Sequence, residues 1–144
     1  MCDQSIWVGD KQGKLHVLDN TLTEVKVIEK HTKAVTALSS NGKIVASGDA
    51  YRYIFVFDGQ THEELFNCGD HKDKILDLHV GNDDTILSVT HDNAYGVISI
   101  TGKKMVTQVK APHGAKAVTN VLLKENTHVI TMGADCALRQ WALP

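Results

Sequence analysis

The stretch that decides the fold is Ile130-Thr131-Met132-Gly133-Ala134-Asp135-Cys136-Ala137-Leu138-Arg139-Gln140-Trp141. It reads as an apolar strand, a tight turn with an acidic residue, and a second strand that ends on an indole. With His113 upstream, an indole N–H, a hydroxyl, an imidazole and a carboxylate could join in one hydrogen-bonded relay. Buried polar groups are costly unless paired. The spacing therefore predicts a structural cluster of His113, Thr131, Asp135 and Trp141.

A histidine recurs along the chain at a regular interval. His31, His71 and His113 are separated by 40 and 42 residues, and each precedes short strand-like runs bounded by turn residues. No window of helical length shows a sustained 3.6-residue apolar period. Four short strands repeating about every 40–45 residues are typical of a WD-repeat β-propeller blade. The chain is therefore predicted to be all-β, with the WD-repeat β-propeller fold.

The earlier repeats keep only part of the four-residue set. The repeat before the last keeps three members and has an aliphatic residue at the Trp position: His71, Ser88, Asp92 and Ile98. The first full repeat keeps a His and a Ser, with aromatic residues expected at the Asp and Trp positions: His31, Ser47, Tyr51 and Phe57. One blade is thus predicted to be typical and the others degenerate.

Residues 1–144 are predicted to form one partial propeller of about three and a half four-stranded blades. Full blades are expected at about 31–68 and 71–110, and blade remnants at 5–28 and 116–142. The first remnant lacks a first strand and the last remnant lacks a fourth. Propellers usually contain about 4–8 blades, so we expect the remaining blades to come from a longer chain or from another copy.

Composition narrows the class of protein. Hydrophobic residues make up 42% and charged residues 22%, with a net charge of −2, which is ordinary for a globular protein and gives no reason to expect nucleic-acid binding. No apolar run reaches the roughly 20 residues that cross a bilayer, and the start lacks the features of a signal peptide. These observations predict a cytoplasmic protein with no membrane partner. The three dispersed cysteines are then expected to be free thiols: Cys2, Cys68 and Cys136.

Catalysis and metal binding are the competing interpretations of the polar residues. His113, Thr131 and Asp135 have the composition of a hydrolytic triad, but Thr131 stands mid-strand in an apolar run, whereas a nucleophile must be exposed. The remaining histidines show no recurrent metal-ligand spacing: His16, His62, His79, His91 and His128. We therefore expect no catalytic residue, no metal and no cofactor.

Two C-terminal segments resemble one WD-repeat family. Residues 110–121 and 130–144 are similar to the opening and the ending of the last blade of the actin-interacting protein 1 family. Residues 8–17 and 23–26 resemble earlier sequence of that family's second propeller, whereas residues 84–110 match only the general repeat. The resemblance implies a protein-binding platform that assists cofilin in actin filament disassembly, with actin and cofilin as partners and a cytoskeletal association. The alternative is a WD-repeat scaffold subunit of another multiprotein assembly.

A binding face can be placed by repeat position. In a propeller, the connections between blades lie on one rim together with the turns between second and third strands. Basic residues at these positions would converge there: Lys33, Lys72, Lys74, Lys116, Lys11, Arg52 and His91. Such a patch could steer an acidic partner such as actin, or its members could simply be solvated side chains; the sequence leaves both interpretations open.

Overall fold

The computed structural model describes residues 5–110, 112–114, 117–124 and 127–143, with only the backbone described at positions 120 and 122–124. Within these residues the chain forms β-strands connected by turns, arranged as four antiparallel sheets that we call blades A to D. Blade A contains β1 (Ile6–Gly9), β2 (Lys14–Leu18) and β3 (Glu24–Glu29). Blade B contains β4 (Val35–Ser40), β5 (Ile44–Asp49), β6 (Ile54–Asp58) and β7 (Glu64–Cys68).

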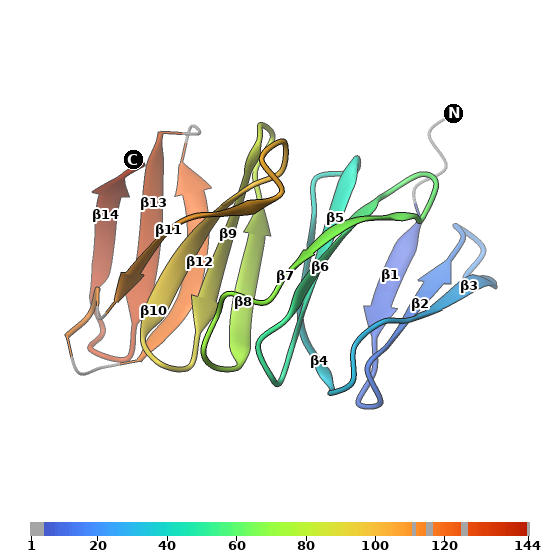
Figure 1. Cartoon of the computed structure of the whole chain (residues 1–144), viewed down its shortest axis with the longest axis horizontal. Helices are drawn as coiled ribbons and strands as arrows, with labels where there is room; N and C mark the ends of the chain where they lie inside the picture. Colours follow the sequence, from blue (N-terminus) through green and yellow to red (C-terminus); the bar gives the residue numbers. More distant parts are fainter. Residues whose placement is uncertain (1–4, 111, 115–116, 125–126, 144) are drawn as a thin grey trace.

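Blade C contains β8 (Ile75–Val80), β9 (Thr85–Thr90), β10 (Ala94–Ser99) and β11 (Lys104–Lys110). Blade D contains β12 (Val118–Lys124), β13 (His128–Gly133) and β14 (Leu138–Ala142). In every blade the strands pair in sequence order (Figure 1). The all-β prediction is therefore confirmed.

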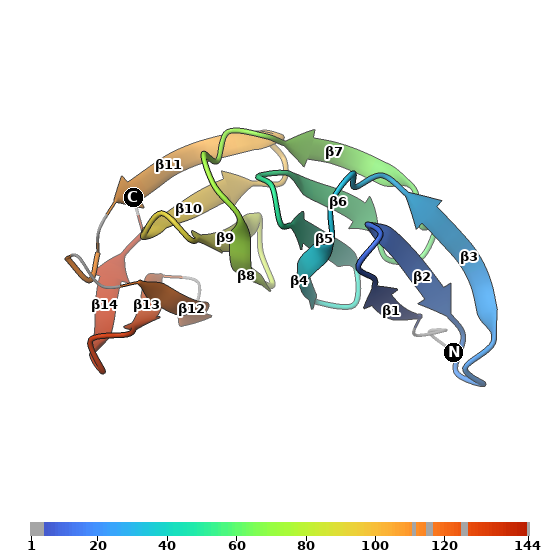
Figure 2. The same cartoon turned by 90° about the horizontal axis from the view of Figure 1, so that it is seen from below.

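The blades stand face to face along an arc, as Figure 2 shows. Strands β4, β8 and β12 lie along the inner side of the arc, and β3, β7 and β11 along the outer side. Apolar side chains from consecutive blades fill the space between the sheets. The core between A and B contains Leu15, Val17, Ile28, Val45 and Phe57, and comparable clusters join B to C and C to D.

Small residues let neighbouring blades approach closely. A Cβ atom added at Gly48 in β5 would lie 2.6 Å from the Cγ2 of Ile75, the first residue of the next blade's inner strand. Gly9 in β1 faces Val35 of β4 in the same way. The register also shifts by one residue near the start of β4, so that the Thr36 hydroxyl donates to the Ile75 carbonyl oxygen at 2.6 Å. A bulge thus directs a side chain across the junction between blades B and C.

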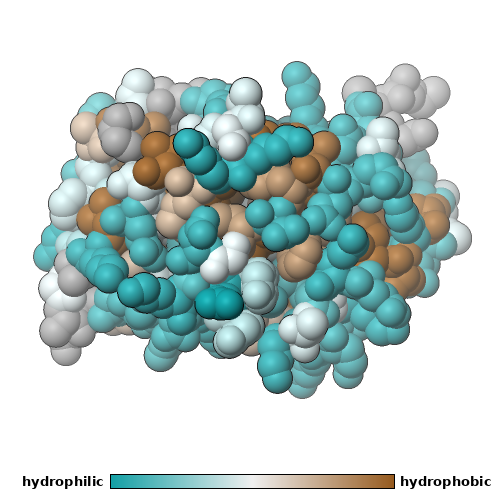
Figure 3. All heavy atoms as spheres, viewed as in Figure 1, coloured by the Kyte–Doolittle hydropathy of each residue, from teal (hydrophilic) through white to brown (hydrophobic). Residues whose placement is uncertain are grey.

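The two ends of the arc expose apolar side chains that have buried counterparts in the interior blades. Ile6 in β1 is 41% exposed, whereas Val45, at the matching position of β5, is 2% exposed. Leu138 in β14 is 65% exposed, whereas Ile54 in β6 is fully buried. On the outer surface, apolar patches lie among hydrophilic side chains, and one patch lies over blade A (Figure 3). The ends therefore differ from the interior in lacking a neighbouring blade within the described residues.

Candidate functional site: polar relays and the loop rim

In blade D the four side chains of the predicted cluster lie in one hydrogen-bonded relay. The indole Nε1–H of Trp141 donates to the Thr131 hydroxyl at 3.0 Å, and that hydroxyl lies 2.9 Å from Nε2 of His113. The other ring nitrogen of His113, Nδ1, lies 2.9 Å from the Asp135 carboxylate. A neutral ring that donates from Nδ1 must accept at Nε2, so the direction of the relay runs from indole to carboxylate.

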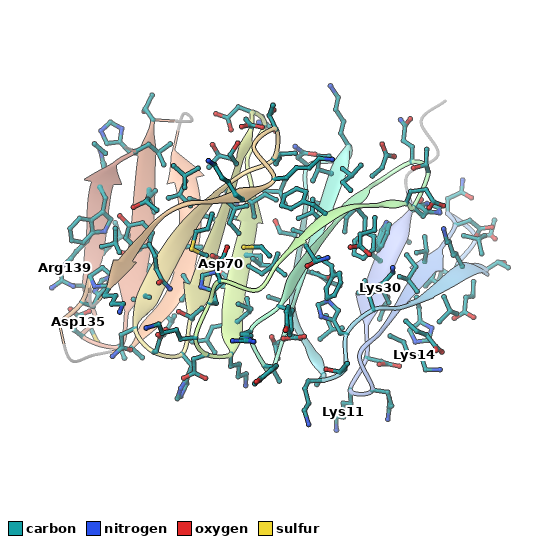
Figure 4. All side chains as sticks on the ribbon, in the orientation of Figure 1. Lys11, Lys14, Lys30, Asp70, Asp135 and Arg139 are labelled. Carbon is teal, nitrogen blue, oxygen red and sulfur yellow. The ribbon has the colours of Figure 1, made fainter. Side chains whose placement is uncertain are left out.

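The carboxylate of this relay is held in its charged form. The guanidinium of Arg139 donates to Oδ2 of Asp135 at 2.6 Å and also contacts the ring of His113. This guanidinium, together with the backbone N–H of Ala137 and the His113 ring, lowers the pKa of Asp135 to about 2. Figure 4 shows Arg139 and Asp135 together at the C-terminal end of the arc. The negative charge stabilises a His113 N–H that points at it.

Blade B builds a relay from a different residue than the sequence analysis expected. Nε2 of His31 lies 2.7 Å from the Ser47 hydroxyl, and Nδ1 lies 2.9 Å from Oδ2 of Asp49. Tyr51 fills the position of Asp135, as the spacing predicts, but the carboxylate of this relay comes from Asp49, which the sequence analysis did not identify. Asp49 ends β5 two residues after Ser47, and both His31 and Asp49 are buried.

Blades B and D take their carboxylates from different places because they have different residues two positions after the relay hydroxyl. Gly133 occupies in β13 the place that Asp49 occupies in β5, and a Cβ atom there would collide with the ring of His113. Blade D therefore takes its carboxylate from the following turn, and blade B takes it from the strand itself. In the sequence, an acidic residue two positions after the relay Ser or Thr therefore indicates the arrangement of blade B.

Blade C keeps only half of the relay. Nε2 of His71 lies 2.7 Å from the Ser88 hydroxyl, but Nδ1 lies 3.3 Å from the side-chain amide of Gln108 in β11. Asp92 instead accepts a hydrogen bond from the Thr90 hydroxyl at 2.5 Å, so assigning Asp92 to the relay was wrong. Burial lowers the pKa of His71 to about 4, and it also lowers the pKa of His31. Both rings are therefore neutral at pH 7.

The Trp position is apolar in blades B and C, as the sequence spacing predicts. In blade D, Trp141 pairs with Val129; at the matching register Phe57 pairs with Val45 in blade B and Ile98 with Ile86 in blade C. Phe57 and Ile98 are both buried. These side chains fill the space of the indole without its N–H.

Blade A contains an imidazole–carboxylate pair that the sequence analysis missed. Nε2 of His16 lies 3.2 Å from Oδ2 of Asp10, and Nδ1 lies 2.6 Å from the Glu24 carboxylate. These two carboxylates, Glu24 first, raise the pKa of His16. Asp10 directly follows β1, at the position that Asp49 has in blade B, and each of these carboxylates accepts hydrogen bonds from backbone N–H groups of the following turn. As in blade B, the acidic residue at this position is the sequence feature that could have indicated the pair.

The geometry of the relays suits a structural role. The hydroxyls of Ser47, Ser88 and Thr131 are fully buried and bonded within their blades, whereas a nucleophile must be reachable. Among the described residues, no group of three or more His, Cys, Asp or Glu side chains could hold a metal ion. The described part of the chain also contains no helix that could cross a membrane.

The predicted basic positions lie on one rim of the arc. We call this the loop rim, and define it as the β1–β2, β5–β6 and β9–β10 turns with the β3–β4 and β7–β8 connections, at the lower edge of Figure 1. Lys11 projects from it in Figure 4. The predicted basic residues that are exposed or half-exposed on the rim are Lys11, Lys33, Arg52, Lys72, Lys74 and His91. Lys116 lies outside the described residues.

The rim carries acidic side chains among the predicted basic ones. Nδ1 of His91 lies 3.3 Å from the Asp73 carboxylate of the neighbouring connection, and exposed Asp92 stands in the same turn as His91. Arg52 is enclosed by two aromatic rings, with its guanidinium carbon 5.2 Å from the Tyr51 centroid and 5.4 Å from the Tyr53 centroid. Repeat position predicted where these residues lie, but it did not reveal which charges pair with neighbours.

Solved structures share this architecture. The chain superimposes on the crystal structure of the computationally designed Ika4 protein with a TM-score of 0.85 and 22% identity, over 98% of this chain and 86% of that one. It matches the RRP9 WD40 repeats with a TM-score of 0.84 and 22% identity, over 98% of this chain and 45% of that one. The chain has the WD-repeat β-propeller fold. U3-55K gives the same TM-score and identity, with 46% of its length covered.

The chain covers 46% of the length of U3-55K and 45% of that of the RRP9 WD40 repeats. At 22% identity the likeness concerns the fold alone. No protein-family model matches the sequence, and no curated protein sequence matches it either.

Proposed function

We propose that this WD-repeat chain is a non-catalytic protein-binding platform whose partners are actin and cofilin. The observation that carries the proposal is the loop rim, where turns and connections of blades A, B and C present exposed side chains on one edge (Figure 1). Its Lys and Arg side chains suit an acidic partner. The resemblance of residues 110–121 and 130–144 to the actin-interacting protein 1 family supplies the identity of that partner.

The relays support a platform because their hydrogen bonds tie the connections and turns of the rim to the blades. Each buried imidazole bonds to a hydroxyl of the second strand, and in blades B and D it also bonds to a carboxylate next to the turn. A surface fixed before binding loses less entropy on association. In this proposal the protein acts in the cytoplasm, in association with the cytoskeleton, and the remaining blades come from a longer chain or another copy.

A WD-repeat scaffold subunit of another multiprotein assembly is the second candidate. The observation that favours it is the mixed charge of the rim, where the Asp73–His91 pair and Asp92 interrupt the basic residues. Interspersed charges select a partner with a matching pattern instead of a uniformly acidic surface. This pattern suits a specific subunit interface as well as it suits actin.

Co-sedimentation with cofilin-decorated actin filaments tests the proposal. The wild-type chain should pellet with the filaments, and reversal of Lys33, Lys74 and Lys116 to Glu should weaken pelleting, as should added salt, because exposed charges are screened over about 8–10 Å. The matched control reverses Lys43, Lys103 and Lys104, which are exposed at the opposite rim.

The control variant should pellet like the wild type. A folded wild-type chain that stays in the supernatant would reject the actin proposal and favour the other assembly. Equal weakening by both triple variants would show that the rim is not the binding site.

A further inference from the structure

We propose that the β5–β6 turn, Tyr51-Arg52-Tyr53, is a preformed docking site for an aspartate or glutamate side chain in an acidic segment of a protein partner. This inference rests on the proposed protein-binding function and specifies the chemistry that one part of the loop rim recognises. The three residues form the tip of blade B, between the end of β5 and the start of β6.

A buried carboxylate holds this turn in place. Oδ1 of Asp49 accepts hydrogen bonds from the backbone N–H groups of Tyr51, Arg52 and Tyr53 at 3.0, 2.9 and 3.0 Å. Its other oxygen, Oδ2, lies 2.9 Å from Nδ1 of His31 inside the blade. Asp49 therefore serves both the relay of blade B and the turn, because it fixes the backbone of all three residues of the proposed site.

Aromatic packing anchors the same turn to the core. The ring of Tyr53 lies 6.4 Å from that of Phe55, and the Phe55 ring meets His31 edge-on at 4.7 Å. Tyr53 also abuts the β7–β8 connection, because a Cβ atom at Gly69 would lie 2.6 Å from its ring. Only Tyr51 stands well out from the surface, at 51% exposure. A site that is fixed before binding avoids most of the ordering cost of association.

Arg52 offers donors without a carboxylate partner. Its guanidinium lies against both tyrosine rings, at 5.2 and 5.4 Å from their centroids. Its Nε is buried within the turn and forms no hydrogen bond there, while Nη2 lies at a long 3.5 Å from the Tyr53 hydroxyl, so the donors offered to a partner are those at the Nη end of the guanidinium. Arg52 takes part in none of the ion pairs found among the described residues. A stacked guanidinium with open donors is the geometry that binds a carboxylate through two parallel hydrogen bonds.

The surroundings favour an acidic segment with an apolar neighbour beside the carboxylate. The β3–β4 connection lies against this turn, since the Ala50 N–H donates to the Ala34 carbonyl oxygen at 2.9 Å. That contact places exposed Lys33 next to the site, where it adds positive charge. The exposed ring of Tyr51 supplies apolar area, and Tyr and Arg are the residues that most often dominate binding energy at protein interfaces. The corresponding turns at 10–13, 91–93 and 134–137 contain neither Tyr nor Arg.

Peptide titration of the full 144-residue chain tests the site. The probe is a fluorescein-labelled peptide, Gly-Asp-Leu-Glu-Gly, and its partner probe has the same sequence with Asn and Gln in place of the acids. Anisotropy measures the dissociation constant, and the side-chain Nε–H signal of Arg52 in a nitrogen–proton correlation spectrum reports contact at the site. The acidic peptide should bind and shift that signal, whereas the amide peptide should do neither.

Substitutions at Arg52 distinguish binding through the paired donors of the guanidinium from binding through its positive charge alone. Arg52→Gln should weaken acidic-peptide binding by at least about tenfold, as expected for a dominant interface residue. Arg52→Lys should lose most of that affinity as well, because an ammonium keeps the charge but not the paired donors. Tyr51→Ser, at an exposed position, should weaken binding several-fold with the fold intact, and the control Lys43→Gln should change it by less than about twofold.

The outcomes distinguish this site from the broader proposal. Full affinity in Arg52→Lys, or equal binding of the acidic and amide peptides, would overturn the carboxylate site. A chain that binds the acidic peptide through Arg52 but does not pellet with cofilin-decorated filaments would keep the site and reject actin as the partner. A chain whose filament binding is unchanged by Arg52→Gln and Tyr51→Ser would keep actin and reject this turn as the point of contact.

Discussion

Replacing Asp49 by Ala should destabilise this chain more than any other single change in the relays. The Asp49 side chain is fully buried and accepts hydrogen bonds from three consecutive backbone amides and from Nδ1 of His31. The Ala variant removes both carboxylate oxygens that accept these hydrogen bonds. The change therefore tests whether the blade B relay stabilises the fold.

The expected loss of stability depends on whether each unpaired donor is buried or can be reached by water. A buried donor without a partner costs about 1–3 kcal/mol, and His31 Nδ1 is such a donor because its side chain is fully buried. The amides of Tyr51 and Arg52 lie in a turn that water can reach, so they recover part of their hydrogen bonding. Because the His31 ring is neutral, no buried charge is left behind, and we expect the unpaired ring nitrogen and the weakened turn amides together to cost about 2–4 kcal/mol in Asp49→Ala. The melting temperature would drop by on the order of 10 °C.

Urea denaturation followed by tryptophan fluorescence measures this loss. Trp7 packs on Phe57 in the core between blades A and B, with ring centroids 5.5 Å apart, so its emission reports the junction that the relay supports. Asp49→Asn is the matched control, because its amide oxygen can still accept from the backbone of the turn, and it should lose less than half as much. Asp135→Ala in blade D should also lose less, because the Asp135 side chain is 19% exposed. An Asp49→Ala variant within about 1 kcal/mol of wild type would refute the reasoning.

Three further predictions concern titration, thiol chemistry and packing. Burial lowers the pKa of His71 from its ordinary 6.5 to about 4. Between pH 4 and pH 6.5 the unfolded chain therefore binds more protons than the folded chain, so the free energy of unfolding should decrease as the pH falls from about 6.5 to about 4. His71→Gln should remove up to about 3 kcal/mol of that pH dependence in urea titrations, and an unchanged slope would contradict the assignment. Burial raises the pKa of Cys68 to about 11, whereas Cys136 is exposed; a thiol reagent should therefore modify Cys136 quickly and Cys68 only on unfolding, with all three cysteines titrating in unreduced denatured protein. Gly48→Ala should cost about 1–3 kcal/mol, because its methyl group would meet the inner strand of blade C. The control is Gly102→Ala at an exposed turn, where the nearest atom to the added methyl group is the Ser99 hydroxyl oxygen at 3.0 Å.

Residue order alone predicted most of the local structure. The period that relates His31, His71 and His113 is a property of covalent sequence, and each strand's alternation of apolar and polar residues follows from its two-residue side-chain period. The spacing of Thr131, Asp135 and Trp141 likewise allows one arrangement within a hairpin of fixed register, and the structure has it.

The partners of His31 and His71 were decided by tertiary structure, because each ring meets side chains from other elements of its blade. Asp49 reaches the His31 ring from the end of β5, and Gln108 meets His71 from β11, 37 residues along the chain. Charge pairing at the loop rim was also decided by tertiary structure, because the distance between His91 and Asp73 depends on how the β9–β10 turn packs against the β7–β8 connection. Hydrogen bonding is short-ranged and directional, so a pattern can show that a polar side chain needs a partner, whereas only the assembled blades determine which one it has.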